Sequence, residues 1–491
     1  MARIRPFILI FFLCLLGCSP TVPERFLDER RLPAIYPDYT SITIPPNIAP
    51  LNFLIEEPGD EYRVRIASED GEPLILRGPN VDVPLKRWKK LLEENLGKKL
   101  RLDVFVRKQS QWTKFQTIVN RVAAEPIDAY VAYRLLEPVF DQYREISLHQ
   151  RNLENFEERC FYNNLRMSGE GGQCANCHSF QNRRTKNMLF HVRAYRGGTV
   201  FLRNGEPEKV DLSLKNFAIA AATYPAWHPT LNLVAFSVNK TSQHFHTVAT
   251  EKVEVLDIAS DLLLYDDDRS EMSFVLLTVN EFETYPAWSP DGNWLYYCNA
   301  KVDFSNRDID ERREEALRHS KEIRYDLMRI PFDQPSRKFG TPELLVDAAS
   351  QGKNVTFPRP SPDGRYVMYC LSHSGCFSIW HRETDLWILD LQTGNTRPLT
   401  EANSSETESF HGWSENGRWF VFSSRRDDGL YTRLYFSYFD EQGRASKPFL
   451  LPQRRPKQNR DMMKSYNIPE FTVEPVRAGF HTITNVVQSE K

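Results

Sequence analysis

The C-terminal two thirds of the chain repeat a pattern of short apolar strands and tight turns. Four segments share a hydroxyl residue, an aromatic residue and a turn related to Ser-Pro-Asp-Gly, and they begin at Thr223, Thr284, Thr356 and Ser409. An apolar stretch of strand length follows each segment. Proline restricts φ in such a turn and glycine supplies a positive φ, so the flanking strands can pair. The pattern predicts an all-β fold in which four-stranded blades stack around an axis as a β-propeller.

Two less regular stretches, residues 124–165 and 172–215, also have strand-like patterns and bring the predicted number of blades to six. Seven blades are the alternative, if residues 468–476 contribute more than a closing strand. We place the propeller at residues 121–475 and a tail at residues 476–491. The charged, helix-prone residues 308–324 are predicted to be a solvated insertion.

Residues 46–120 are predicted to form a small β-rich domain before the propeller. Tyr62, Val64 and Ile66 alternate with arginines, which is the period of a half-buried strand, and residues 100–106 alternate in the same way. Between them, Pro84 and Gly97 bracket a predicted helix at about residues 85–95.

The N-terminus has the pattern of an export signal. Two arginines precede an apolar run at residues 7–16, which is too short to span a bilayer, and the run ends in Leu15-Leu16-Gly17-Cys18. That ending resembles a bacterial lipobox, which implies cleavage of residues 1–18 as a signal peptide and lipidation of Cys18. A plain secretory signal is the alternative. The proline-rich residues 19–45 are predicted to be a tether, and Ser19 after the cysteine suggests the outer membrane, with the protein facing the periplasm.

Composition agrees with a folded, sheet-rich body. Aromatic residues make up 12% of the 491 residues, and charged residues make up 26% with a formal net charge of -2. This balance favours neither nucleic acid nor an anionic surface as a partner. The membrane contact is therefore expected to come from the lipid on Cys18.

The motif with the most specific chemistry is Cys174-Ala-Asn-Cys177-His178. Two thiols at this spacing can each form a thioether with one vinyl group of a porphyrin, and the adjacent histidine is then the proximal ligand of the iron. Such attachment takes place outside the cytoplasm, where the signal sequence sends the chain. The motif predicts one covalently bound haem c. The alternatives are a structural or redox-active disulfide between the two cysteines, and a zinc site, for which no fourth ligand is evident.

The distal ligand is harder to identify from sequence. Met188 follows the motif, but two antiparallel strands across residues 181–186 would hold it away from His178. The loops on the same face of the propeller carry His244, His246 and His381, which are candidate distal ligands, and Arg425 and Arg426, which can pair with haem propionates. A five-coordinate haem is equally compatible with the sequence. The three histidines are also candidates for a separate metal site, and Cys370 is close enough to Cys376 in sequence to form a disulfide.

The chain as a whole, from about residue 35 to residue 475, resembles a family of Bacteroidetes envelope proteins with TolB-like, WD40-like (PD40) propeller repeats. Some members are named for cytochrome c biosynthesis. The four repeats carry the resemblance, together with Cys174-Ala-Asn-Cys-His-Ser-Phe and the segment from Phe422 to Arg433. The resemblance implies the propeller fold and an envelope location, and it implies no established activity.

These observations favour an exported, membrane-anchored propeller with one haem, for electron transfer or haem-based sensing with a redox partner of the envelope. The alternative is a non-enzymatic TolB-like scaffold that binds other envelope proteins, with the two cysteines bridged. A hydrolase is less favoured, because Gly412-Trp-Ser-Glu-Asn-Gly417 has the wrong spacing for a nucleophile elbow and is typical of a blade turn. The sequence motifs therefore favour a function other than catalysis.

Overall fold

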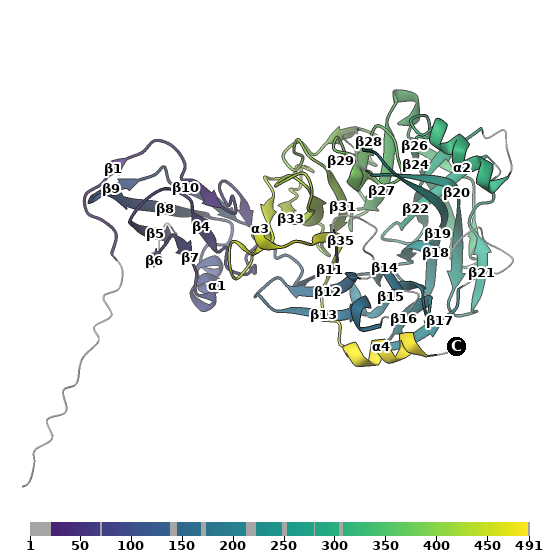
Figure 1. Cartoon of the computed structure of the whole chain (residues 1–491), viewed down its shortest axis with the longest axis horizontal. Coiled ribbons are helices and arrows are strands. Elements are labelled where there is room, and N and C mark those ends of the chain that lie inside the picture. The colour runs from purple at the N-terminus through teal and green to yellow at the C-terminus, as the bar shows by residue number, and fades with distance from the viewer. Residues whose placement is uncertain are drawn as a thin grey trace, which may run out of the picture.

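The computed structural model of the chain is all-β, with many small antiparallel sheets in a propeller-like arrangement (Figure 1). It describes residues 21–68, 71–137, 145–167, 173–212, 222–247, 253–278, 280–303 and 308–489. The predicted signal peptide and its lipidation site, Cys18, lie outside these residues. In the part of the chain that is described, no helix is both long and apolar enough to cross a membrane.

The N-terminal part contains two sheets and one helix. Its elements are β1 (Leu27–Asp28), β2 (Ile35–Tyr36), β3 (Thr43–Ile44), β4 (Phe53–Ile55), β5 (Glu61–Ala67), β6 (Leu74–Arg77), β7 (Asn80–Val81), α1 (Leu85–Glu93), β8 (Lys99–Lys108), β9 (Gln111–Lys114) and β10 (Ile118–Val122). The strands predicted at residues 62–66 and 100–106 are β5 and β8, which pair with each other, and the predicted helix is α1. Trp88 of α1 is buried, and its indole N–H donates to the carbonyl of Ile48.

The ordered structure begins before residue 46. Three short strands lie within the stretch predicted to be a tether: β1 pairs with β9, β2 with β4 and β3 with β10. Tyr39 and Ile42 between them are buried in the core that α1 also enters. Residues 27–45 therefore belong to the folded unit, and proline in this stretch marks turns between strands rather than a free linker.

Six further sheets follow, and each has four or five strands. Their strands are β11 (Tyr130–Leu136), β12 (Ser147–Asn152) and β13 (Glu158–Asn163); β14 (Gln173–Gln181), β15 (Arg184–Ala194), β16 (Gly198–Arg203) and β17 (Glu206–Val210); β18 (Ala222–Trp227), β19 (Leu233–Phe245), β20 (Val253–Asp266) and β21 (Glu271–Phe274); β22 (Glu281–Trp288), β23 (Trp294–Lys301), β24 (Asp326–Asp333), β25 (Lys338–Phe339) and β26 (Glu343–Val346); β27 (Asn354–Pro360), β28 (Tyr366–Ser372), β29 (Asp385–Asp390) and β30 (Thr396–Pro398); and β31 (Glu408–Trp413), β32 (Trp419–Ser424), β33 (Arg433–Tyr438) and β34 (Phe449–Leu450).

The C-terminal strand β35 (Ser465–Thr472) closes the arrangement. It pairs with β11 and completes the sheet of β11, β12 and β13, so the first of the six sheets contains both the first and the last strand of the propeller-like part. Strands β14, β18, β22, β27, β31 and β35 each contact the next in turn, and β14 contacts β35. These six strands therefore surround a common axis.

Each of the six axial strands contains the same irregularity. Its pairing register shifts at one point, where two residues oppose one on the neighbouring strand, which is a β-bulge. One non-glycine residue at each bulge has a positive φ between 45° and 56°: Cys177, Tyr224, Tyr285, Phe357, Phe410 and Ile468. Cys177 of the Cys174–His178 motif therefore occupies the same structural position as an aromatic residue of the sequence repeat.

The last described residues form a helix rather than an extended tail. Helix α4 (Phe480–Gln488) contacts β13, β16 and β17, and its Ile483 and Val487 are buried in the core between the first two sheets (Figure 1). The predicted insertion at residues 308–324 contains helix α2 (Ile309–Arg318), which is mostly exposed and buries Ala316.

Candidate functional site

Strand β14 carries the whole Cys174–His178 motif. Side chains of a regular strand alternate between two directions, and the bulge at Cys177 and His178 breaks this alternation. Cys174 is half-buried, whereas Cys177 and His178 are 5% and 3% exposed. The predicted antiparallel pair is confirmed: β15 runs back along β14, and Met188 lies opposite Phe180 rather than near His178.

The two thiols share one cavity near the axis, which we call the cysteine cavity. Its volume is about 320 Å³, and most of its surface is apolar. Besides Cys174 and Cys177, the apolar lining residues are Leu136, Ile146, Ala194, Tyr224, Val255, Phe377, Phe410 and Ile468, and the neutral polar ones are Asn176, Thr223, Asn239, Thr241 and Gln243. The cavity thus combines two thiols with a mainly apolar surface that suits an apolar ligand.

Two arginines also line the cysteine cavity. Arg134 lies on β11 and is 2% exposed, and Arg193 lies on β15 and is half-buried. Burial lowers the pKa of the Arg134 guanidinium, and the nearby Cys174 and Cys177 oppose this shift. Burial raises the pKa of the Cys174 thiol, and the charges of Arg134 and Arg193 partly offset the effect.

Both cysteines of the motif are free thiols in the structure. The disulfide that we considered as an alternative is therefore not formed here, although both sulfurs face the same cavity. Cys370 and Cys376 are also free and buried, so the disulfide considered between them is absent as well. The Cys370 sulfur instead lies 3.7 Å from Nδ1 of His411, and the Cys376 sulfur donates to the carbonyl of Val255.

His178 faces a second cavity on the other side of the six bulges. Neither of its ring nitrogens makes a hydrogen bond of ordinary geometry with a described residue, although the backbone of Ile468 is close. Burial, reinforced by the charge of Arg134, lowers the pKa of His178 to about 3. The imidazole is therefore neutral at physiological pH, which is the form that ligates metals.

We call this second space the tryptophan cavity, because Trp227, Trp288 and Trp413 lie in its wall. Its volume is about 460 Å³. Each of the three indoles donates to a backbone carbonyl of the preceding sheet, at Ser179, Ala226 and Arg359 respectively. Repetition of this contact around the axis makes the wall a fixed part of the fold.

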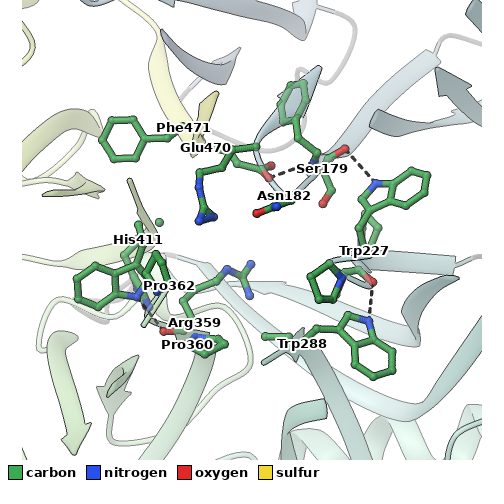
Figure 2. A pocket seen from close by; sticks show the side chains of 18 of the residues that line it. Ser179, Asn182, Trp227, Trp288, Arg359, Pro360, Pro362, His411, Glu470 and Phe471 are labelled. Carbon is green, nitrogen blue, oxygen red and sulfur yellow. Dashed lines mark hydrogen bonds between the residues drawn. The ribbon is translucent and has the colours of Figure 1, made fainter. Parts of the chain in front are cut away.

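The tryptophan cavity has charged groups at its centre. Figure 2 shows the Arg359 and Glu470 side chains pointing into it from different strands. Glu470 accepts a hydrogen bond from the backbone N–H of Phe180 at 3.1 Å. Burial nevertheless raises the pKa of Glu470 to about 7.

The three candidate distal histidines line neither cavity. His381 contacts Glu254, with 3.2 Å between Nε2 and Oε1, and His244 lies 2.9 Å from the hydroxyl of Ser242. His246 is exposed. Among the described residues no cluster of histidine, cysteine and carboxylate side chains could hold a metal ion, so the separate metal site considered for these histidines is not formed.

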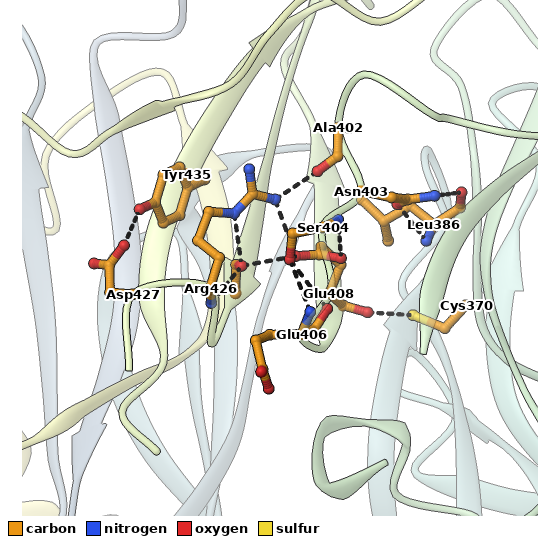
Figure 3. Close-up of polar contacts among 11 residues, drawn as sticks. Cys370, Leu386, Ala402, Asn403, Ser404, Glu406, Glu408, Arg426, Asp427 and Tyr435 are labelled. Atoms are coloured by element: carbon orange, nitrogen blue, oxygen red, sulfur yellow. Dashed lines mark hydrogen bonds and ion pairs between the residues drawn. The ribbon is translucent and has the colours of Figure 1, made fainter. Parts of the chain in front are cut away.

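Arg425 and Arg426, the residues predicted to pair with propionates, also lie elsewhere. Arg426 donates to the carboxylate of Glu408, the hydroxyl of Ser424 and the carbonyl of Ala402 (Figure 3). The Arg425 guanidinium lies over the ring of Trp380, 4.2 Å from its centroid. The sequence did not identify these structural contacts, because Trp380, Ala402 and Glu408 lie 18 to 45 residues before the arginines that they contact.

Arg134 was missed in the sequence, although a signal for it exists. It interrupts the apolar strand 130–136, in which every residue after Tyr130 is buried. An arginine at a fully buried strand position is rare unless it is paired. The apolar run around Arg134 indicates an interior strand, but its position beside Cys174 depends on the pairing of β11 with β35 and the contact of β35 with β14.

The residues present fit a haem in part. Two thiols in one mainly apolar cavity suit the two vinyl groups, and two arginines suit the carboxylates. His178 is neutral, and neither of its ring nitrogens makes a hydrogen bond of ordinary geometry with a described residue, so one is free to ligate iron, but the side chain faces the tryptophan cavity. In this structure the thiols and the imidazole are therefore on opposite sides of the bulge.

No protein-family model and no curated protein sequence matches the chain. Solved structures give distant matches. A mutant of the Synechocystis apocarotenoid oxygenase is 12% identical over 88% of this chain and 95% of its own, with a TM-score of 0.39. An oligogalacturonate lyase in complex with manganese is 12% identical over 70% and 87%, with a TM-score of 0.30. The tricorn protease is 11% identical over 85% and 37%, with a TM-score of 0.32. At such TM-scores these proteins establish no activity for this chain.

Proposed function

We propose that the chain is an exported, lipid-anchored envelope protein with a six-bladed TolB-like propeller that carries one c-type haem. The six sheets of four or five strands would be the blades, and β35 the closing strand of the first. The folded unit before them would be a separate small domain. The lipid on Cys18 would hold the protein at the outer membrane, facing the periplasm, where it meets a redox partner or another envelope protein.

One observation carries this proposal: Cys174 and Cys177 line the same cavity, together with Arg134 and Arg193. Addition of a thiol S–H across a vinyl double bond forms a thioether without a leaving group or an oxidant. Cys174 and Cys177 would hold the group in this way, and His178 would ligate its iron. A bound haem supplies one-electron transfer or ligand sensing, and the protein supplies the apolar walls and the neighbouring charges.

The test is expression in a periplasm with an active cytochrome c maturation system, followed by a haem-stained denaturing gel. We expect a haem band in the wild type, which is lost in the double variant Cys174→Ser, Cys177→Ser. Cys160→Ser is the matched control, because Cys160 is a half-buried free thiol of the neighbouring sheet outside both cavities. Its band should be unchanged. A wild type that stays unstained while a known cytochrome is matured beside it would refute the proposal.

The position of His178 favours a second candidate, a non-enzymatic scaffold without haem. The tryptophan cavity is then the binding site for a partner, because Arg359 and Glu470 offer a positive and an ionisable group within rigid aromatic walls. A charge-reversing change, Arg359→Glu, would weaken co-purification of the partner from envelope extracts. In the haem protein this change should leave the stained band unaltered.

A further inference from the structure

Arg134 is a buried charge for which the described residues provide no counter-charge. It forms no hydrogen bond or ion pair with any residue that the structure describes, and its Nε and Nη1 atoms are buried without a partner. The groups whose charges affect its pKa are Cys174, Cys177, Tyr224 and Arg193, none of which is a carboxylate. An isolated buried cation is costly, so proteins pair such groups.

The chain pairs an equally buried arginine elsewhere. Arg433 is also 2% exposed, and its guanidinium donates to the backbone carbonyls of Thr432, Lys464 and Met462. Arg134 has no such acceptors among the described residues. The contrast indicates that Arg134 is placed for a group that the described residues do not contribute.

The surroundings of Arg134 limit the chemistry of that group. Arg193 adds a second positive charge to the same cavity, and its Nε is likewise buried without a partner. Glu137, at the same cavity, already lies 3.8 Å from the ammonium group of Lys464. The rest of the wall is mainly apolar, so the cavity suits a ligand with an apolar body and acidic groups at one edge.

We propose that Arg134 and Arg193 bind the carboxylates of the group held in the cysteine cavity. This inference rests on the proposed function, in which the group is a haem and the carboxylates are its two propionates. A guanidinium can donate two parallel N–H bonds to one carboxylate, which makes arginine suited to this role. The two arginines thus replace Arg425 and Arg426 as the anion-binding residues of the site.

The test measures recognition of the carboxylates in a protein that cannot attach the porphyrin covalently. The full chain with Cys174→Ser and Cys177→Ser, made without maturation, is titrated with protoporphyrin IX and with its dimethyl ester, which has the same ring but no charge. Quenching of tryptophan fluorescence reports binding. We expect the diacid to bind more tightly than the ester by about tenfold for each carboxylate engaged.

Adding Arg134→Met and Arg193→Met should abolish the preference for the diacid. Arg444→Met, which removes an exposed arginine outside both cavities, is the control and should preserve it. Three results would overturn the inference: equal binding of diacid and ester, no saturable binding of either, or an equal loss of preference in Arg444→Met.

The two proposals fail separately. Covalent haem in the wild type without a preference for the diacid would leave the proposed function standing and refute the role of the arginines. Conversely, the protein could prefer the diacid through Arg134 and Arg193 but never acquire covalent haem. That result would support the anion site and refute the c-type attachment.

Discussion

Arg134 and Arg433 have the same side chain and the same exposure but different surroundings. Arg433 is satisfied by backbone carbonyls, whereas Arg134 has no partner among the described residues. A buried charge without a partner costs folding free energy, and a paired one costs much less. The stability of the protein without ligand should therefore respond to the two arginines in opposite directions.

We expect Arg134→Met to raise the free energy of unfolding of the ligand-free protein by about 1–3 kcal/mol. Arg433→Met should lower it by about 2–4 kcal/mol, because three carbonyls lose their donor. Urea unfolding followed by tryptophan fluorescence measures both. If Arg134→Met lowers the free energy of unfolding as much as Arg433→Met does, the Arg134 guanidinium must have hydrogen-bond partners within the protein.

A buried carboxylate on β22 makes stability depend on pH. Glu283 is fully buried, and only one of its oxygens is bonded, to the hydroxyl of Thr278. Burial raises its pKa from 4.5 to about 7. Because the folded state holds this proton more tightly than the unfolded chain, the contribution is present below about pH 4.5 and is lost as the pH rises through 7.

The variant Glu283→Gln should therefore flatten the pH dependence of unfolding. Between pH 5 and pH 8 the wild type should lose about 2–3 kcal/mol more than the variant. Glu441→Gln, which changes an exposed carboxylate, serves as the control and should follow the wild type. Parallel curves for wild type and Glu283→Gln would contradict the assignment.

At the scale of elements, the repeat turn has a physical basis that the sequence shows well. Ser289, Ser361 and Ser414 each accept a hydrogen bond from the backbone N–H five residues later, at 2.9 to 3.0 Å. Ser414, considered above for a nucleophile elbow, is thus confirmed as a turn residue. The spacing of serine, proline and glycine was enough to predict these turns and the strands beside them.

Loss of this hydroxyl should destabilise the protein. Ser361 is 2% exposed, and Ser361→Ala leaves the Tyr366 N–H without its acceptor, which should cost about 1–3 kcal/mol. Ser336 is an exposed turn serine bonded to Asp333, and Ser336→Ala should change stability by less than about 0.5 kcal/mol. Thermal unfolding measures the pair, and equal midpoints would argue against a structural role for the hydroxyl.

The bulge was not predictable in the same way. Most copies of the repeat contain Thr, then Tyr or Phe, then Pro, whereas the Cys174–His178 motif shares none of these residues. The structure superimposes the two, so that Cys177 matches the aromatic residue and His178 matches the residue after it, which is His411 in the last repeat. The split between thiols and imidazole follows from this superposition, because the bulge turns successive side chains toward different cavities.

At the scale of the whole molecule, the sequence predicted the fold class and most strands but not the long-range contacts. The closing role of β35, the docking of α4 and the early start of the folded unit depend on partners far away in the chain. The same holds for the site, because Arg134 and Cys174 are brought together by the pairing of β11 with β35 and by the contact of β35 with β14. Local patterns carry no information about such contacts.

The most direct test of the account is the intact mass of the protein purified from an envelope with active cytochrome c maturation. For the wild type we expect cleavage before Cys18, acylation of that residue and the added mass of one haem. In the double variant Cys174→Ser, Cys177→Ser we expect the acylation to remain and the mass of the haem to be absent. A mass that shows the lipid but no haem, from cells that mature another cytochrome, would contradict the central claim and leave an anchored scaffold protein.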